Sequence, residues 1–127
     1  MDKTLCLVMI VKNESTILKR CFDSISDYID YWVICDTGST DNTKDIITTY
    51  FKEKNIPGEL HETPWVNFGH NRTISIHKAY KKADYLLVCD ADFYINIKDT
   101  DFKKKLTHNI YLLKYEGNLN YRDKRLM

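Results

Sequence analysis

The feature that most constrains this chain is the stretch from Leu86 to Asp92, in which four apolar residues lead directly into two carboxylates spaced i, i+2. An apolar run of this length between polar residues is typical of a strand that is buried on both faces. The carboxylates then lie where the strand leaves its sheet, and in a parallel sheet this edge is where ligands bind. The stretch therefore favours an α/β fold with a ligand site at a sheet edge.

Asp90 and Asp92 are spaced so that both side chains can reach one point beyond the strand end. Two neighbouring carboxylates repel each other unless a positive group joins them. Mg²⁺ and Mn²⁺ are hard cations that take one or two carboxylates together with substrate phosphates. The alternative is a polar strand end with two solvated aspartates, and the D-x-D pattern alone does not decide between these interpretations.

Length and composition are those of an ordinary globular domain: 127 residues, of which 43% are hydrophobic and 29% are charged. We expect a single domain over residues 1–127. A net charge of +1 gives no electrostatic reason to expect a nucleic acid or an anionic membrane as partner. No apolar run reaches the length of a transmembrane helix, and the residues before the first strand show no signal-peptide pattern.

The four cysteines include no C-x-x-C pair. Three lie in apolar, strand-like runs, and Cys21 falls on the apolar stripe of an expected helix. We interpret all four as small buried hydrophobes, which predicts a soluble protein in a reducing, cytoplasmic compartment and argues against a zinc site or a disulfide framework.

Strands and helices alternate along the chain, as in a parallel sheet with right-handed crossovers. Apolar runs predict strands at residues 5–11, 31–35 and 85–89, a short strand at 59–62 and a further strand at 110–115. Apolar stripes predict three helices: one capped by Asn13, one opened by the turn at 37–43, and one running from the cap Asn67 to about Ala83.

This topology brings the carboxyl ends of three strands to one edge of the sheet. These ends carry Lys12-Asn13-Glu14, Asp36 and Asp90-Ala91-Asp92. Polar groups from distant parts of the sequence therefore converge, which indicates a site more strongly than the D-x-D pattern by itself.

Asp36 follows four apolar residues of the second strand, a position from which a carboxylate commonly accepts hydrogen bonds from a nucleotide. The alternative is a helix cap, but Thr40 or Asp41 is better placed for that role. Gly38 is expected to supply a positive φ in a structural turn. The turn matches neither the dinucleotide-binding motif nor the P-loop motif.

Arg72 shares a helical stripe with Phe68 and Ile76, so its side chain is expected to point toward the sheet. A guanidinium in that position is costly unless it is paired. Two interpretations stay open: Arg72 binds a ligand's anion or base, or it forms a structural ion pair with Asp36 or Asp90.

Five short segments stand in an order and spacing that resemble the family 2 glycosyltransferases of the GT-A fold, over roughly residues 4 to 95. The segments are Val11–Glu14, Cys21–Ile25, Val33–Thr43, Trp65–Arg72 and Cys89–Asp92. The resemblance implies an α/β, Rossmann-like, mostly parallel sheet flanked by helices. This three-layer sandwich would be a short or truncated version of the fold.

The resemblance also implies a metal-dependent hexosyl- or N-acetylhexosaminyltransferase that moves sugar from a UDP-sugar to a glycan or protein acceptor, with Mn²⁺ or Mg²⁺. The metal would neutralise the diphosphate leaving group. The residues implied to bind the nucleotide sugar are Val11, Lys12, Asn13, Glu14, Asp36, Arg72, Asp90 and Ala91. Asp36 would bind the base, Arg72 the base or a phosphate, Asp92 the metal directly, and Asp90 the ribose or a metal-bound water.

The chain also departs from this family pattern. Members usually have a second half that supplies the acceptor site and a catalytic base, and many carry an acidic residue where this chain has Phe93. Few acidic residues follow Asp92, and Asp123 and Glu116 are the candidates for the base. A second domain or subunit is therefore expected to supply the acceptor site.

Two other functions are considered. One is a non-catalytic nucleotide-sugar-binding module, or a half-domain of a larger transferase, which the sequence does not separate from an active enzyme. The other is a nucleotidyltransferase, which is disfavoured because Lys12-Asn13-Glu14 stands where such enzymes have a Gly-rich, basic loop.

Overall fold

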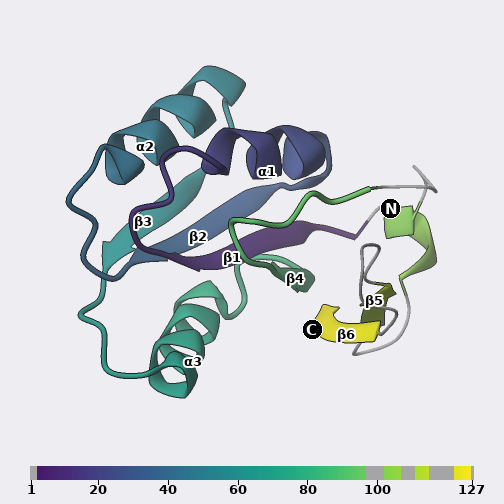
Figure 1. Cartoon of the computed structure of the whole chain (residues 1–127). Helices are drawn as coiled ribbons and strands as arrows, with labels where there is room; N and C mark the ends of the chain where they lie inside the picture. The colour runs from purple at the N-terminus through teal and green to yellow at the C-terminus, as the bar shows by residue number, and fades with distance from the viewer. Residues whose placement is uncertain (1–2, 97–101, 107–110, 115–121, 127) are drawn as a thin grey trace.

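The computed structural model describes residues 3–96, 102–106, 111–114 and 122–126, in which one sheet has the strand order β3-β2-β1-β4-β6-β5 (Figure 1). The strands are β1 (Leu5–Val11), β2 (Tyr31–Asp36), β3 (Gly58–Glu62), β4 (Tyr85–Val88), β5 (Tyr111–Lys114) and β6 (Arg122–Leu126). The α-helices are α1 (Leu18–Ile25), α2 (Thr43–Lys54) and α3 (Phe68–Ala79), and the 3₁₀ helices are η1 (Ser26–Tyr28) and η2 (Phe102–Lys105). None of the described helices combines the length and the apolar character needed to cross a bilayer.

The first four strands are parallel, which confirms the predicted α/β sheet. β1 pairs with β2 and β4, and β3 pairs with β2 at one edge. β6 lies antiparallel between β4 and β5 and was not predicted. Its sequence, Arg-Asp-Lys-Arg-Leu, lacks the apolar run by which a strand is recognised. β6 is defined by its backbone pairing with β4 and β5, which the pattern of side chains does not reveal.

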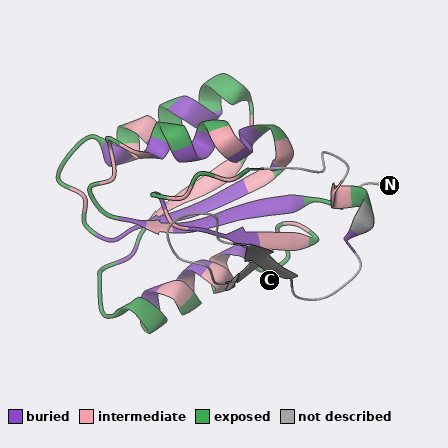
Figure 2. Cartoon of the chain, turned by 45° about the vertical axis from the view of Figure 1, so that its right-hand side comes forward, coloured by how far each residue is buried: buried purple, intermediate pink, exposed green. Residues whose placement is uncertain are grey.

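Helices cover both faces of the sheet, and this confirms the three-layer arrangement (Figure 1). Along β1, Leu5, Leu7 and Met9 pack in the core that α1 and α2 cover, while Cys6 and Val8 pack in the core beneath α3. Alternate residues of a strand point to opposite faces, so only a continuous apolar run can fill both cores. Figure 2 shows the resulting buried centre, with the exposed residues on the outer sides of the helices.

An aromatic cluster fixes α1 and α2 on their face of the sheet. The ring centroids of Phe22 and Phe51 lie 4.7 Å apart, and Trp32 stacks on Phe51 at 4.8 Å. The Trp32 ring also lies over Gly58, where an added Cβ would come within 2.2 Å of ring atoms. Gly58 therefore permits this packing, because any side chain there would displace the indole.

Asn13 was wrongly predicted to cap α1, which begins without any side-chain cap. The backbone at Asn13 has φ of +52°, and its Oδ1 accepts hydrogen bonds from the backbone N–H of Thr40 at 2.8 Å and of Asp41 at 3.3 Å. The left-handed backbone carries the side chain to the loop after β2 instead of the first turn of α1. Asn13 therefore links the end of β1 to the loop that follows β2. At the start of α2, Asp41 Oδ1 accepts a hydrogen bond from the Thr43 N–H.

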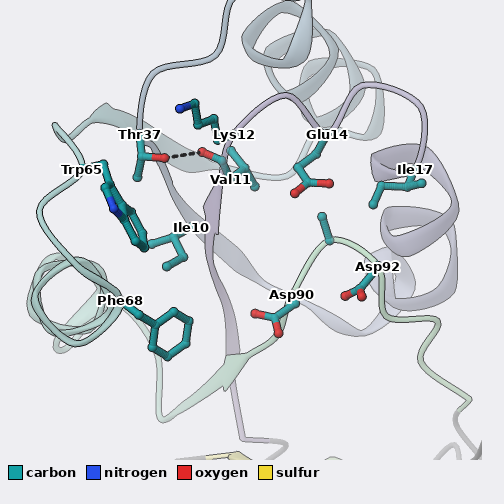
Figure 3. Close-up of a pocket in the computed structure, with 11 residues that line it drawn as sticks. Ile10, Val11, Lys12, Glu14, Ile17, Thr37, Trp65, Phe68, Asp90 and Asp92 are labelled. Carbon is teal, nitrogen blue, oxygen red and sulfur yellow. Dashed lines mark hydrogen bonds between the residues drawn. The ribbon is translucent and has the colours of Figure 1, made fainter.

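α3 begins at the predicted cap, where Asn67 Oδ1 accepts from the His70 N–H at 2.8 Å, but it ends at Ala79 and not near Ala83. Lys81 has φ of +65°, so a turn ends the helix before β4. Phe68 was expected on the buried stripe, yet it is 55% exposed. It is the first residue of the helix, and its ring lines a pocket at the end of the sheet (Figure 3).

Candidate functional site

A pocket of about 520 Å³ opens at the carboxyl edge of the parallel strands (Figure 3). This volume lies within the range of small-molecule and cofactor sites. The described residues that line it are Ile10, Val11, Lys12, Glu14, Ile17, Thr37, Trp65, Phe68, Asp90, Ala91 and Asp92. The predicted convergence of the strand ends is therefore confirmed.

The register of the sheet explains why these segments meet. Val11 at the end of β1 lies opposite Asp36, and Val8 lies opposite Val88 of β4. Backbone hydrogen bonds continue past the strands, from the Thr37 N–H to the carbonyl of Val11 at 2.9 Å and from the Cys89 N–H to that of Val8 at 3.2 Å. β1 and β2 therefore end at the same level, whereas β4 ends three residues earlier, opposite Val8.

The structure brings most of the predicted site residues together. Five of the eight proposed nucleotide-sugar ligands line the pocket, namely Val11, Lys12, Glu14, Asp90 and Ala91, and so does the proposed metal ligand Asp92. Asn13, Asp36 and Arg72 are not among the lining residues. Of the two candidates for the base, Asp123 lies in β6 opposite Leu113, and Glu116 falls outside the described residues.

One end of the pocket is acidic. Glu14 faces Asp90 and Asp92 across the hollow (Figure 3). Burial, and after it the charges of Asp92, Asp90 and Asp41, raise the pKa of Glu14 above its usual value. The carboxylates are thus close enough to repel one another, and a cation between them would relieve that repulsion.

A divalent metal ion fits this acidic end only together with ligand oxygens. In the described part of the chain, no group of three His, Cys, Asp or Glu side chains could hold a metal ion by itself. Mn²⁺ and Mg²⁺ accept one or two carboxylates and complete their shells with water and substrate phosphates. Asp90 and Asp92 supply such a pair, so the donor set suits a metal that arrives with a phosphate-bearing ligand.

Arg72 of α3 is paired with one of these carboxylates. Its Nη2 donates to Asp90 Oδ1 at 2.9 Å, with the Arg72 side chain 12% exposed and the Asp90 side chain 35% exposed. The guanidinium also lies over the Phe68 ring, 5.2 Å from its centroid. Its Nη1 is buried and has no partner among the described residues. The ion pair is thus present, and one buried donor nitrogen has no partner among the described residues.

Asp36 closes the turn after β2. Its Oδ1 accepts hydrogen bonds from the backbone N–H of Gly38 at 2.9 Å and of Ser39 at 2.8 Å, and Gly38 has φ of +127°, as predicted. The residue is 2% exposed, and within the described residues its Oδ2 is buried without a partner. One oxygen therefore shapes the turn, while the other is a buried acceptor without a described partner, which is rare in folded proteins.

α1 holds the acidic turn from the opposite side, a contact that sequence reasoning missed. Arg20 Nη2 donates to the backbone carbonyl of Asp92 at 3.0 Å, and the Cys21 thiol lies 3.8 Å from the carbonyl of Asp90. Arg20 lies on the exposed side of its helix, so its sequence position resembles that of any solvated arginine. Only the folded loop places a carbonyl within its reach.

The other end of the pocket is aromatic and apolar. Trp65 and Phe68 flank Ile10 there, with Thr37 beside them, away from Asp92 (Figure 3). Both rings are largely exposed, Trp65 at 52% and Phe68 at 55%. Trp65 lies in a segment that resembles the family pattern, but the sequence alone gives this residue no role in the site.

Asn71 is a third residue whose role the sequence does not predict. It is fully buried in α3, its Oδ1 accepts from the Val66 N–H at 2.9 Å, and its Nδ2 donates to the Pro64 carbonyl at 3.1 Å. A buried amide needs such partners. Both partners adjoin Trp65, so Asn71 fixes the backbone on either side of it.

Comparison with known sequences gives a consistent result. The family model of glycosyl transferase family 2 matches residues 6–102. A TPR repeat-containing protein of Synechococcus elongatus is 37% identical over 87 residues, which cover 68% of this chain and 20% of that protein. The SPbeta prophage-derived glycosyltransferase SunS of Bacillus subtilis is 28% identical over 112 residues, covering 88% and 25%. The chain thus spans a fifth to a quarter of the length of these relatives.

Solved structures share the fold at low sequence identity. The mannosyltransferase PcManGT from Pyrobaculum calidifontis, in complex with GDP-Man and Mn²⁺, gives a TM-score of 0.58 at 20% identity, covering 72% of this chain and 28% of that one. Residues 1–349 of S. aureus TarS give 0.61 at 21% identity, covering 73% and 28%. Glucosyl-3-phosphoglycerate synthase from Mycobacterium tuberculosis in complex with UDP gives 0.53 at 20%, covering 72% and 34%.

Proposed function

Since the chain belongs to glycosyl transferase family 2 and has the GT-A fold, we propose that its pocket binds the nucleoside-diphosphate-sugar donor of a glycosyl transfer reaction. The observation that carries this proposal is the two-ended pocket, with Trp65 and Phe68 at one end and Glu14, Asp90 and Asp92 at the other. A donor of this class has a planar base at one end and a diphosphate that binds metal ions toward the other. The two ends of the pocket match these two groups.

The acidic end requires a cation for this ligand, because a diphosphate and three carboxylates repel one another. We assign Asp92, together with Asp90, to holding Mn²⁺ or Mg²⁺. When bound, the ion neutralises the diphosphate leaving group. Among the related folds, PcManGT was solved with GDP-Man and Mn²⁺, which supports a metal-bound nucleotide sugar in this chain as well.

The remaining residues bind and orient the donor. Val11, Lys12 and Glu14 line the pocket at the end of β1. Asp36 is assigned to the base, because its Oδ2 is a buried acceptor without a described partner. Arg72 is assigned to the base or a phosphate, because its Nη1 is a buried donor without a described partner.

The finer assignments extend the same proposal. The donor is a UDP-sugar carrying a hexosyl or N-acetylhexosaminyl group, the acceptor is a glycan or a protein, and residues 1–127 form the donor-binding domain. A further domain or subunit supplies the acceptor site. The catalytic base comes from there or from Asp123 or Glu116. A module that binds nucleotide sugars without transferring them is the alternative, because the chain spans only part of its relatives.

An assay with several donors tests the proposal. UDP-glucose, UDP-galactose, UDP-N-acetylglucosamine and GDP-mannose are each incubated with the chain in Mn²⁺ or in EDTA, and binding is measured by calorimetry and hydrolysis by release of the nucleotide. Metal-dependent hydrolysis of one donor supports an active transferase, and metal-dependent binding without hydrolysis supports the binding module. If no donor binds under either condition, the proposed function is wrong.

A further inference from the structure

We propose that Trp65 is the stacking platform for the base of the bound nucleotide and that Asn71 positions it. This inference rests on the proposed function and specifies how the pocket recognises its donor. Stacking on an aromatic side chain is a strong, base-tolerant contribution to nucleotide affinity.

The Trp65 ring is available to a ligand. It lines the pocket, it is 52% exposed, and within the described residues it takes part in no hydrogen bond, ring contact or cation–π contact. The other tryptophan, Trp32, is buried, stacks on Phe51 and donates its indole N–H to the Ile56 carbonyl at 3.0 Å. An exposed indole in a pocket, next to exposed Val66 and Phe68, marks a recognition surface, because folding alone favours burying such a side chain.

Buried polar bonds hold the Trp65 backbone. Asn71 accepts from the Val66 N–H and donates to the Pro64 carbonyl, so the residues on both sides of Trp65 are bonded to one fully buried side chain. At the position before Pro64, the Thr63 N–H donates to the Asp36 carbonyl at 2.9 Å. A ring on a loop held in this way is pre-organised, which lowers the conformational entropy lost on binding.

Phe68 is less suited to stack on a base. The Arg72 guanidinium already lies over its ring, and Asp90 holds that guanidinium in place at 2.9 Å. The other described side chains at this end, Ile10 and Thr37, have no π face. Trp65 is therefore the ring that the structure leaves open to a planar ligand.

The same geometry separates affinity from base choice. Every base has a π face, so stacking on Trp65 gives similar affinity for uridine, guanosine and adenosine nucleotides. Hydrogen bonds therefore have to distinguish one base from another. We assign this role to the Asp36 carboxylate, because it directly precedes Thr37 at this end of the pocket and its Oδ2 has no partner among the described residues.

The test compares Trp65→Ala and Trp65→Phe with the wild-type chain, using UDP, GDP and pyrophosphate, each with Mn²⁺, in calorimetry. The matched control is Tyr80→Ala, which removes a ring that is 69% exposed and lies outside the pocket. We expect Trp65→Ala to weaken UDP and GDP binding by about 5- to 150-fold, the range that loss of one base–aromatic stack produces. Pyrophosphate has no base, so its affinity stays unchanged. Trp65→Phe keeps most of the nucleotide affinity, and Tyr80→Ala keeps all of it.

Fluorescence gives an independent readout, because the chain has two tryptophans. UDP with Mn²⁺ quenches the emission of Trp65 in the wild-type chain, and Trp65→Phe abolishes this change while retaining UDP binding. Nucleotide binding that is equally tight in Trp65→Ala and wild type overturns the inference and leaves the proposed function standing. Equal losses for UDP and pyrophosphate also overturn it, because they reveal a general distortion of the pocket. A wild-type chain that binds no nucleotide overturns the proposed function and this inference with it.

Discussion

The Arg72 guanidinium donates to Asp90 Oδ1 at 2.9 Å, and this contact joins α3 to the acidic turn that follows β4. The pair lies between the two ends of the pocket, since Arg72 also covers Phe68 and Asp90 faces Glu14 and Asp92. Removing either charge is therefore expected to change both the stability of the fold and the electrostatic potential around a metal-bound ligand in the pocket.

Arg72→Met tests the first of these effects. The methionine keeps much of the apolar contact of the stem, but it leaves Asp90 beside two other carboxylates. We expect the free energy of unfolding without ligand to fall by about 1.5–3 kcal/mol, as for other hydrogen bonds to charged groups. The loss stays below that for a fully buried pair because the Asp90 side chain is 35% exposed and retains water.

Urea denaturation with and without UDP and Mn²⁺ measures both effects of Arg72→Met. The ligand-induced gain in stability should shrink, because the unpaired Nη1 is assigned to the donor. Arg72→Lys keeps the charge but not the planar group, and it serves as the control for charge alone. A methionine variant that keeps its full ligand-induced gain restricts Arg72 to a structural role.

Two substitutions of Asp36 separate its role in the turn from its role in binding, because only one of them keeps an acceptor for the turn. Asp36→Asn retains an oxygen that can accept from the Gly38 and Ser39 N–H groups, so the turn after β2 persists and the melting temperature changes little. Asp36→Ala removes that acceptor and should cost about 1–3 kcal/mol of stability. Asparagine replaces the carboxylate by a neutral group, so UDP binding should weaken by about 1.5–3 kcal/mol, the value of a charge-assisted hydrogen bond.

Calorimetry with UDP and thermal melts of both Asp36 variants give the comparison. If Asp36→Asn binds UDP as tightly as the wild-type chain does, Asp36 is a turn residue and another group reads the base. A large loss of stability in Asp36→Asn would likewise favour the structural role.

The parts of the fold that the sequence predicts are those governed by burial. β1, β2 and β4 are covered on both faces, so their sequences have to be apolar throughout, and the run from Leu86 to Cys89 identifies such a strand directly. Alternation of strands with helices then sets the parallel topology. That topology places Glu14 and Asp90 at one edge without any knowledge of distances.

The parts that the sequence does not predict depend on contacts between distant loops. Asn13 has the residue type of a helix cap, but a left-handed backbone carries its side chain to the loop after β2. Asn71 sits on an amphipathic helix, and only the folded loop brings Pro64 and Val66 against it. Local sequence pattern contains no information about such pairings, because they require the loop path to be known.

Asp92→Ala tests the metal site. In the wild-type chain we expect UDP to bind more tightly in Mn²⁺ than in EDTA, because the ion joins the diphosphate to the acidic turn. Asp92→Ala should abolish that difference while leaving the affinity measured in EDTA unchanged or slightly higher, since one repelling carboxylate has gone.

The matched control for Asp92→Ala is Asp45→Ala, which removes an exposed carboxylate of α2 that does not line this pocket. Calorimetric titrations of UDP in both metal conditions measure the effect for each variant. An undiminished response to Mn²⁺ in Asp92→Ala would remove Asp92 from the metal site.

Glu59 of β3, which does not line the pocket, makes the stability of the fold depend on pH. Burial alone would raise its pKa, but hydrogen bonds from Tyr31, Lys82 and His61 outweigh burial and lower the pKa from 4.5 to about 2. The folded-state pKa lies below the unfolded one, so ionised Glu59 stabilises the fold fully above about pH 4.5. This stabilisation is lost as the pH falls from 4.5 through about 2.

Glu59→Gln should therefore flatten the decline of stability in this pH range. Denaturant melts at several pH values measure the slope for the wild-type chain, for Glu59→Gln and for Glu53→Gln, an exposed carboxylate of α2 that serves as the control. The control should follow the wild-type slope. Equal slopes in wild type and Glu59→Gln would show that other carboxylates dominate acid unfolding.

Asn71→Ala tests a residue that lies outside the pocket. The alanine leaves the Val66 N–H and the Pro64 carbonyl without their partner, and we expect stability to fall by about 1–3 kcal/mol. The backbone on either side of Trp65 is then no longer fixed, so UDP should bind more weakly although no residue of the pocket has changed. Pyrophosphate affinity should stay as it is in the wild-type chain.

A double-mutant cycle separates positioning from general destabilisation. If Asn71 acts through Trp65, the double variant Asn71→Ala with Trp65→Ala binds UDP no more weakly than Trp65→Ala does alone, because the ring that Asn71 positions is already gone. Additive losses in UDP affinity would contradict this coupling. Ser75→Ala serves as the control, because Ser75 is also a fully buried polar residue of α3 but bonds to the Arg72 carbonyl of its own helix and not to the loop. It should lower stability without changing UDP affinity.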